Sequence, residues 1–470
     1  MNTESTVQES ASVTLESIRK PAEHSSSEPL LTQPITKQFM LLALPIIISL
    51  MINGLYSFID AIFITRGVGI EAMAAVSAVF PIHMLIISIS GLLGTGMASI
   101  ISRKLGSGDR EGASQVFSNS MLFAITVGLI CSVVMFFSRH SLFDLLALPS
   151  NLLGNANSYL LPILSITAFS FASGTLSECF RASGKAKDMM KVMLFGSLAN
   201  ILFDALFIFG FKWGVAGAAW ATVVAMMLSL TLAIRLQLSG SDRVKLQWRY
   251  LRYNWQTHKQ VLALGLPTFL SHGGFAFTLA LTIYAITLYS GSDASMMISA
   301  HGLLMRSFML LFLPLLGMVI ALQTLSGFNY GAGKIARVKQ SLITAIAFGT
   351  IWTSIVTLIL VYKPQWLLTL FTDDIQLIAV ASDISSIAFL GFVCAASSMM
   401  CSGVFQAMGK ALPAMLLDST RTYILLLPVL LNLPKWLGVE GIWLSFPIAD
   451  YSGALLAVTF TTWYFHKRVN

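Results

Sequence analysis

The stretch KQFMLLALP at residues 37–45 returns in altered form as KQVLALGLP at residues 259–267. Two further pairs follow in the same order: FRASGK at 180–185 with FQAMGK at 405–410, and GVAG at 214–217 with GVEG at 438–441. The offset between the two members is nearly the same in every pair, as their starting positions show (37 and 259, 180 and 405, 214 and 438). Three ordered matches at a nearly constant offset indicate that the chain consists of two copies of one unit.

Both copies are rich in long apolar segments. Of the 470 residues, 56% are hydrophobic and 11% charged, and the mean hydropathy is +0.78. Soluble domains carry about 25% charged residues, whereas about 20 consecutive apolar residues span a bilayer as a helix. The sequence therefore predicts an all-α polytopic membrane protein with twelve transmembrane helices. The expected spans are 38–64, 73–101, 115–138, 156–179, 190–210, 215–236, 261–289, 297–325, 341–362, 377–403, 411–432 and 440–465.

The distribution of basic residues supports twelve spans. If the N-terminus is cytoplasmic, 22 of the 29 Lys and Arg residues fall on cytoplasmic turns and tails and five on the opposite side. Cytoplasmic segments of membrane proteins carry such an excess, so both termini are expected in the cytoplasm. Topology also accounts for the net charge of +8, and no nucleic-acid partner is expected.

Because each unit contains six spans, both units enter the membrane from the same side. The two six-helix lobes should then be related by a pseudo-twofold axis along the membrane normal. Residues 1–36 are polar and are predicted to form a disordered cytoplasmic tail. Residues 37–238 form the expected N-terminal lobe, 239–260 a basic and aromatic cytoplasmic linker, and 261–470 the C-terminal lobe.

Two lobes around a central axis can alternate between inward-open and outward-open forms, so a transporter is the expected class; a channel does not need two such lobes. No Walker motif, HExxH motif or nucleophile elbow occurs, which argues against an ATP site and against an enzyme. The four cysteines show neither metal-site spacing nor a disulfide framework. No cofactor is expected. A membrane-embedded enzyme, the alternative from another class, would need a catalytic constellation that the sequence does not offer.

Two carboxylates interrupt the apolar spans of the first lobe. Asp60 lies in the first span and Asp204 in the fifth, and Asn200 precedes Asp204 by one helical turn. With Thr222 in the sixth span, these residues fall at depths of ~9 to ~18 Å from the outer face, at 1.5 Å per residue. Ionised side chains within a membrane usually face a bundle interior or a wet cavity. The four oxygen-bearing side chains suit Na⁺, and they equally suit a proton shared between two acids.

The second lobe provides a comparison. The positions that correspond to Asp204 in the second copy of the repeat are Pro428 and Val429, so the packing of the repeat does not require an acid there. Pro45 precedes Asp60 on the same span and is expected to permit a helix bend.

Other charged residues lie within the spans. Asp418 and Arg421 are three residues apart and are expected to pair within one helix. Asp450 or Asp383 could neutralise Arg306.

Several motifs together resemble the multidrug and toxic compound extrusion (MATE) family over residues 36–466. Pro45 with LY at 55–56 and Asp60 resembles the first-span pattern. The other matching segments are ISRKLG at 101–106, FRASGK at 180–185, NILFD at 200–204, GVAGAAWAT at 214–222 and QTLSGFNYGA at 323–332. The branch resembled is the DinF-like one, because Phe275 and Ala395 stand near the places where NorM-like members carry a glutamate and an aspartate.

This resemblance implies a function. It places cation or proton binding at Asp60, Asn200, Asp204 and Thr222, with Na⁺ as one candidate ion. The implied activity is export of amphipathic or cationic drugs in exchange for H⁺ or Na⁺, by a monomer in the bacterial cytoplasmic (inner) membrane. The alternative within transport is a flippase for a lipid-linked oligosaccharide, which would be expected to carry cationic residues in its cleft.

Overall fold

The computed structural model describes residues 28–145, 148, 150–239 and 244–468, and this part of the chain is helical with no β-strand. A short helix, α2 (Glu28–Thr32), precedes the spans. The N-terminal lobe contains α3 (Ile35–Gly67), α4 (Ile70–Gly106), α5 (Arg110–Leu145), α6 (Leu153–Ser165), α7 (Thr167–Ala182), α8 (Ala186–Asp204), the π-helix η2 (Ala205–Gly210) and α9 (Val215–Leu238). The 3₁₀ turns η1 (Ser150–Leu152) and η3 (Trp248–Tyr250) lie before α6 and in the linker.

The C-terminal lobe repeats this order. It contains α10 (Trp255–Tyr289), α11 (Ala294–Gly331), α12 (Ile335–Tyr362), α14 (Ile375–Ala388), α15 (Ala395–Ala407), α16 (Ala411–Ser419), the π-helix η6 (Thr420–Leu426), α17 (Leu427–Asn432) and α19 (Val439–Arg468). Short elements connect these helices: η4 (Gly291–Asp293), α13 (Gln365–Leu368), η5 (Phe392–Cys394) and α18 (Pro434–Leu437).

The predicted twelve spans are confirmed if each of two bent helix pairs counts as one. Among the described residues, 10 helices are long and apolar enough to cross a membrane, and two further pairs reach that length together. One pair, α6 with α7, bends by 55°, and the other, Ile375–Ala388 with Phe392–Ala407, bends by 51°. The breaks lie near Ile166 and Leu390, which occupy equivalent positions in the repeat. The bends were not predicted, but they follow the internal repeat.

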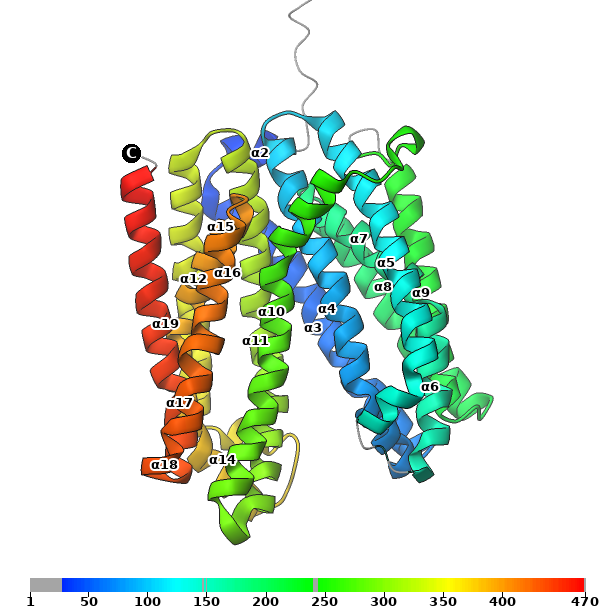
Figure 1. Cartoon of the computed structure of the whole chain (residues 1–470), viewed down its shortest axis with the longest axis vertical. Coiled ribbons are helices and arrows are strands. Elements are labelled where there is room, and N and C mark those ends of the chain that lie inside the picture. The colour runs from blue at the N-terminus through cyan, green and yellow to red at the C-terminus, as the bar shows by residue number, and fades with distance from the viewer. Residues whose placement is uncertain (1–27, 146–147, 149, 240–243, 469–470) are drawn as a thin grey trace, which may run out of the picture.

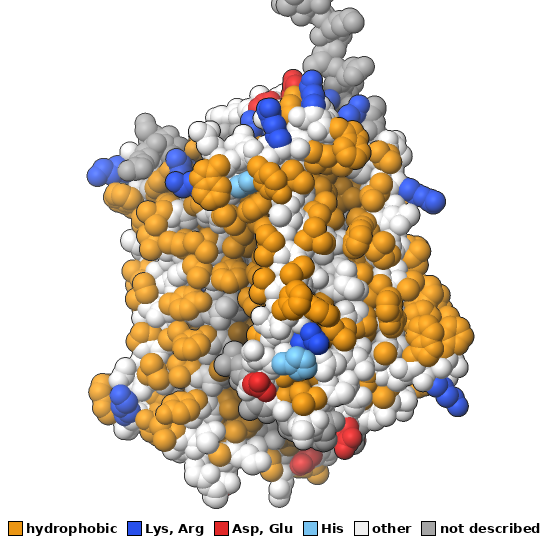
Figure 2. Space-filling view, turned by 45° about the vertical axis from the view of Figure 1, so that its right-hand side comes forward, with side chains coloured by type: hydrophobic (Ala, Val, Ile, Leu, Met, Phe, Trp, Pro, Cys, Tyr) orange, Lys and Arg blue, Asp and Glu red, His pale blue; other side chains and the backbone are white. Residues whose placement is uncertain are grey.

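Figure 1 shows the two lobes side by side. Their helices converge at the end where α2 lies, called here the α2 end, and diverge towards the opposite end. Helix α19 also ends at the α2 end. Space-filling Figure 2 shows a broad hydrophobic band between the two ends, with many Lys and Arg side chains at the α2 end. This distribution matches a bundle that crosses a bilayer.

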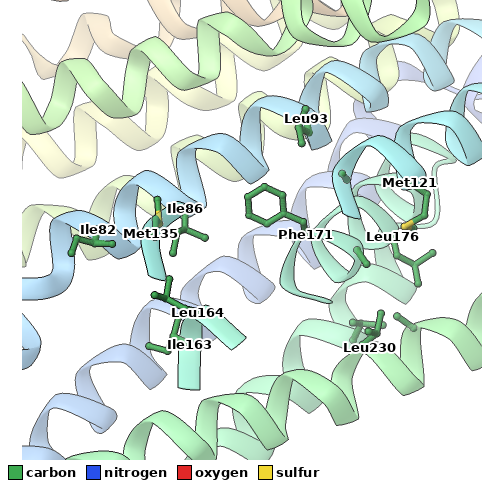
Figure 3. Packing of buried hydrophobic residues seen from close by; sticks show 14 of the residues in the cluster. Ile82, Ile86, Leu93, Met121, Met135, Ile163, Leu164, Phe171, Leu176 and Leu230 are labelled. Carbon is green, nitrogen blue, oxygen red and sulfur yellow. The ribbon is translucent and has the colours of Figure 1, made fainter. Parts of the chain in front are cut away.

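Each lobe has its own buried core. In the N-terminal lobe, side chains from α4, α5, α6, α7 and α9 pack together, among them Leu93, Phe171 and Leu230 (Figure 3). The first helix of each lobe, however, also contributes to the core of the other. Phe39 of α3 stacks on Phe348 of α12, with ring centroids 6.0 Å apart. His258 of α10 stacks in turn on Phe123 of α5 at 4.3 Å.

The two stacking partners, Phe123 and Phe348, are separated by the offset of the repeat and are therefore equivalent positions. The half of α3 at the α2 end thus packs in the C-terminal lobe, whereas Ile64, near the other end of α3, packs in the N-terminal core. Helix α3 thus passes from the C-terminal lobe to the N-terminal lobe along its length. Pro45 lies in the half of α3 that packs in the C-terminal lobe.

Helices α4 and α11 meet at the α2 end through two glycines. A Cβ atom on Gly106 would collide with the carbonyl group of Phe328, and a Cβ on Gly331 would collide with the carbonyl group of Arg103. Gly106 and Gly331 occupy equivalent positions in the repeat, as do Arg103 and Phe328. The two contacts are therefore related by the repeat. Only glycine permits this approach of the two backbones.

Polar contacts between the lobes surround the two glycines. Ser99 Oγ donates to the carbonyl of Gln406 at 2.5 Å, and Arg103 Nη1 donates to the carbonyl of Ala407 at 3.0 Å. From the same lobe, Arg181 Nη1 donates to Thr324 Oγ1 at 3.2 Å. We call the two glycine contacts and these three hydrogen bonds the inter-lobe seam. The seam joins the two lobes at the α2 end.

Two predicted boundaries need correction. Residues 1–27 of the predicted tail and 240–243 of the linker lie outside the described residues. Residues 28–36, however, are not disordered, because 28–32 form α2 and α3 begins at Ile35. The linker is also shorter than predicted, because α10 begins at Trp255. The Asn254 side chain accepts a hydrogen bond from the Thr257 amide and so caps that helix.

Candidate functional site

The four predicted site residues lie together in the N-terminal lobe. Helix α8 packs against both α3 and α9, so Asp60 on α3 and Thr222 on α9 both approach the end of α8. Asn200 and Asp204 lie on α8 itself, and both are almost completely buried. The side chains of Asp60 and Asp204 are within hydrogen-bonding reach of each other.

A chain of hydrogen bonds extends from Asp204. With the Asn200 amide oriented by its partners, its nitrogen donates to Asp204 Oδ2 at 3.0 Å. Its oxygen then accepts from the backbone amide and the hydroxyl group of Thr222, each at 3.3 Å. Asn200 therefore fixes one oxygen of Asp204 and leaves the other available.

One oxygen of each acid has no partner. Asp60 Oδ1 and Asp204 Oδ1 are both buried and accept no hydrogen bond from the described residues. A buried carboxylate without a donor or counter-charge is costly. Two such oxygens in neighbouring carboxylates favour a bound proton or a small cation. The oxygen-only donor set fits Na⁺, although no cluster of three or more His, Cys, Asp or Glu suited to a metal occurs among the described residues.

Two tyrosines lie near this site. Tyr56, one helical turn before Asp60, and Tyr159 on α6 both lie close enough to the two carboxylates to interact electrostatically with them. The first was visible in the sequence as a residue on the same helix face as Asp60. Tyr159 was missed, since an aromatic residue within an apolar span resembles ordinary packing.

The helix geometry changes directly after Asp204. Helix α8 ends at Asp204 and continues as the π-helix η2, a form that is often found at functional sites. A Cβ on Gly67, the last residue of α3, would collide with Ile208 of this segment. The end of α3 is therefore packed tightly against the segment that follows the site.

The C-terminal lobe holds a different polar network. Ser271 on α10 donates to Asp418 Oδ2. Arg421 Nε donates to Asp450 Oδ1 of α19 at 2.6 Å. The predicted pairing of Asp418 with Arg421 was therefore wrong, and Asp450 neutralises Arg421 rather than Arg306. These partners lie on different helices, which sequence spacing could not indicate.

Replacing Arg421 by methionine is expected to destabilise the protein by about 3 kcal/mol, because the Asp450 carboxylate would remain buried without its counter-charge. The double variant Arg421→Met/Asp450→Leu should recover most of this loss. Thermal unfolding of the purified proteins in detergent would measure both effects. Equal stabilities of the single and double variants would contradict the assigned ion pair.

Similarity to known proteins extends over nearly the whole chain. A family model described as MatE matches residues 45–206 and 274–431. The chain is 22% identical over 458 residues to the probable multidrug resistance protein YoeA of Bacillus subtilis (strain 168), covering 94% of this chain and 98% of that protein. It is 24% identical over 427 residues to the multidrug export protein MepA of Staphylococcus aureus (strain MSSA476), covering 90% and 93% respectively.

The fold also matches a solved structure, described as the outward-facing conformation of a multidrug resistance MATE family transporter of the MOP superfamily. The TM-score is 0.87 at 24% identity, with 94% of this chain and 99% of that chain covered. The likeness extends over both lobes.

Proposed function

Because the chain belongs to the MATE family of membrane transporters, we propose that it is a secondary active antiporter that exports amphipathic or cationic compounds in exchange for H⁺ or Na⁺. The observation that carries this proposal is the pair of neighbouring acids, Asp60 and Asp204, each with a buried oxygen that lacks a partner. The names of its relatives, a multidrug resistance protein and a multidrug export protein, support drugs as substrates. Two acids in one lobe favour this reading over transport of a lipid-linked diphosphate.

We place the protein in the bacterial cytoplasmic membrane with the α2 end in the cytoplasm. The matched relatives are bacterial, and the excess of Lys and Arg on the α2 side agrees with the topology of membrane proteins. In this orientation the inter-lobe seam closes the cytoplasmic end, and the described form faces outward.

The proposed cycle begins with ion uptake from outside. A proton or Na⁺ binds between Asp60 and Asp204 and neutralises charge that is costly to bury. Helix α3, which packs in both lobes, then shifts relative to α8, with Pro45 as the expected point of bending. The drug leaves outward, the seam opens, and the ion enters the cytoplasm. Each net charge that one exchange cycle moves across 100 mV supplies about 2.3 kcal/mol, or roughly a fiftyfold concentration ratio.

The test uses purified protein in liposomes that are loaded with a fluorescent cationic dye. A Na⁺ gradient and a pH gradient are imposed separately, with the membrane potential clamped by K⁺ and valinomycin. Dye movement driven by one gradient alone would identify the coupling ion. If neither gradient moves dye, the proposed function is wrong, and lipid-linked substrates should be tested next.

Replacing Thr222 by valine is expected to weaken ion binding about fivefold, because Asn200 loses the hydroxyl group that helps to orient it; one hydrogen bond is worth about 1 kcal/mol. Thr222→Ser keeps the hydroxyl and should behave like the wild type. The ion concentration that gives half-maximal transport measures this effect. Similar values for the valine and serine variants would exclude a role for the hydroxyl group.

A further inference from the structure

The short helix α2 is fastened to the C-terminal lobe by its backbone carbonyl groups. Arg337 Nη2 donates to the carbonyls of Gln33 at 2.7 Å and Leu30 at 3.2 Å, and Lys334 Nζ donates to the carbonyl of Leu31 at 3.0 Å. The last carbonyls of a helix lack partners within the helix, and cationic donors suit that end. Lys334, which precedes α12, and Arg337, in the first turn of α12, therefore satisfy carbonyl groups of α2 and of Gln33 directly after it.

Arg337 is itself held in position. Its Nε donates to Asn329 Oδ1 at 2.8 Å, and Asn329 Nδ2 donates to the carbonyls of Leu325 at 2.8 Å and Leu30 at 3.3 Å. Asn329 is completely buried. The guanidinium group thus meets α2 in a fixed orientation, which reduces the entropy lost in forming its hydrogen bonds.

The Leu30 side chain of α2 lies between the lobes: it belongs to the buried cluster of the C-terminal lobe, which also includes Ala186 of α8. Leu30 is 4% exposed, and its Cδ1 atom would lie 2.8 Å from a Cβ built on Gly184, in the turn between α7 and α8. Gly184 has φ of +74°, a conformation that favours glycine. The Leu30 side chain therefore also contacts the N-terminal lobe, at Gly184, while its carbonyl binds the C-terminal lobe, so α2 bridges the two lobes next to the inter-lobe seam.

The repeat places a similar contact in the linker. The amides of Lys245 and Gln247 each donate at 3.0 Å to hydroxyl groups on α5, those of Ser114 and Ser118. Arg249 Nη2 donates to Glu111 Oε1 of the same helix at 2.6 Å. Helices α5 and α12 are equivalent in the repeat, so each segment that leads into a lobe's first helix docks on the third helix of the opposite lobe.

From this arrangement we propose that residues 28–34 form a clasp that holds the α2 end shut, with Arg337 as its positioning residue. The inference rests on the proposed alternation between two open forms. In the form described here the clasp is engaged. When the lobes separate at the α2 end, the contact of Leu30 with Gly184 and the hydrogen bonds from Arg337 to the carbonyls of Leu30 and Gln33 cannot both persist. Either the contact or the hydrogen bonds must break. The clasp thereby sets the fraction of molecules that face outward.

The test measures that fraction directly, in full-length protein. Spin labels are placed on exposed residues at the α2 end of the two lobes, at Lys187→Cys and Leu412→Cys, in a protein whose four natural cysteines are replaced. Distance distributions are recorded by pulsed electron resonance in lipid nanodiscs. Arg337→Ala is expected to raise the population with the longer label distance about tenfold. Leu30→Ser, which acts from the other side of α2, should change it in the same direction.

Two controls separate the clasp from a general loss of stability. Lys191→Ala removes an exposed basic residue at the same end that pairs with Asp188, and it should leave the distances unchanged. Arg337→Lys keeps the charge and should raise the population with the longer label distance less than Arg337→Ala does. Unchanged distances in both Arg337→Ala and Leu30→Ser would overturn the proposal.

The experiment also distinguishes the clasp from the transport function. If wild-type protein moves dye but Arg337→Ala and Leu30→Ser both leave the distances unchanged, the clasp is wrong and the antiporter stands. If Arg337→Ala shifts the distances but wild-type protein moves no dye with any gradient, the clasp stands and the transport proposal fails.

Discussion

Replacing Asp204 by asparagine is expected to abolish ion-driven export. The amide nearly matches the carboxylate in shape, so Asn200 can still reach it, but it can neither bind a proton at neutral pH nor offer a charge to Na⁺. Dye movement driven by the ion gradient that energises the wild type should fall to the level of protein-free liposomes. The measurement uses dye-loaded liposomes with the gradient that drives the wild type.

Asp373→Asn is the matched control, since Asp373 is an exposed acid outside the helices. It should transport like the wild type. Because Asp204→Asn removes an unpaired charge from a buried position, its thermal stability should equal or exceed that of the wild type. Loss of transport together with loss of stability would point to misfolding. Normal gradient-driven dye movement by a stable Asp204→Asn variant would remove Asp204 from the coupling mechanism.

Replacing Gly331 by valine is expected to force the inter-lobe seam apart. The new side chain would meet the carbonyl group of Arg103, which belongs to the backbone of α4 and cannot move independently. Overpacking of this kind costs about 1–3 kcal/mol, enough to change the ratio of the two facing forms by roughly five- to 150-fold. Spin-label distances at the α2 end should lengthen, and the repeat-equivalent Gly106→Val should give the same change.

A second glycine on the same helix supplies the control. A Cβ on Gly302 would meet nothing within 4 Å, so Gly302→Val carries the same cost in helix propensity without the collision. Its distance distribution should match that of the wild type. If Gly331→Val and Gly302→Val give the same distances, the close approach of α4 and α11 does not hold the α2 end closed.

Long apolar segments and the internal repeat were sufficient to predict the twelve spans, because the bilayer imposes length and composition on each of them. The bends near Ile166 and Leu390 were not predicted, since neither changes the apolar pattern. Asp60, Asn200, Asp204 and Thr222 were recognisable because polar residues are rare within spans, and the structure places their side chains together. Their roles in ion binding stay a prediction.

Other residues could not be assigned from the sequence. Tyr159 joins the site through the packing of α6, and nothing in its neighbourhood in the sequence marks it. Arg421 has Asp418 one helical turn away, yet it pairs with Asp450 on another helix. The segment 28–34 ends a long polar stretch that is typical of disorder. It is ordered by the burial of Leu30 and by hydrogen bonds to its carbonyl groups, which every sequence possesses and which therefore leave no signal.

The first helix of each lobe packs partly in the core of the other lobe. This packing affects how the chain folds during its synthesis on the ribosome. Phe39 is synthesised long before its stacking partner Phe348, which belongs to the second copy of the repeat. At roughly 10 residues per second, half of α3 would remain without its native neighbours for about 30 s. During that interval the nascent N-terminal lobe would expose an incomplete surface to lipid or to insertion factors. A lobe expressed alone should therefore be more vulnerable to proteolysis than the same residues within the complete chain.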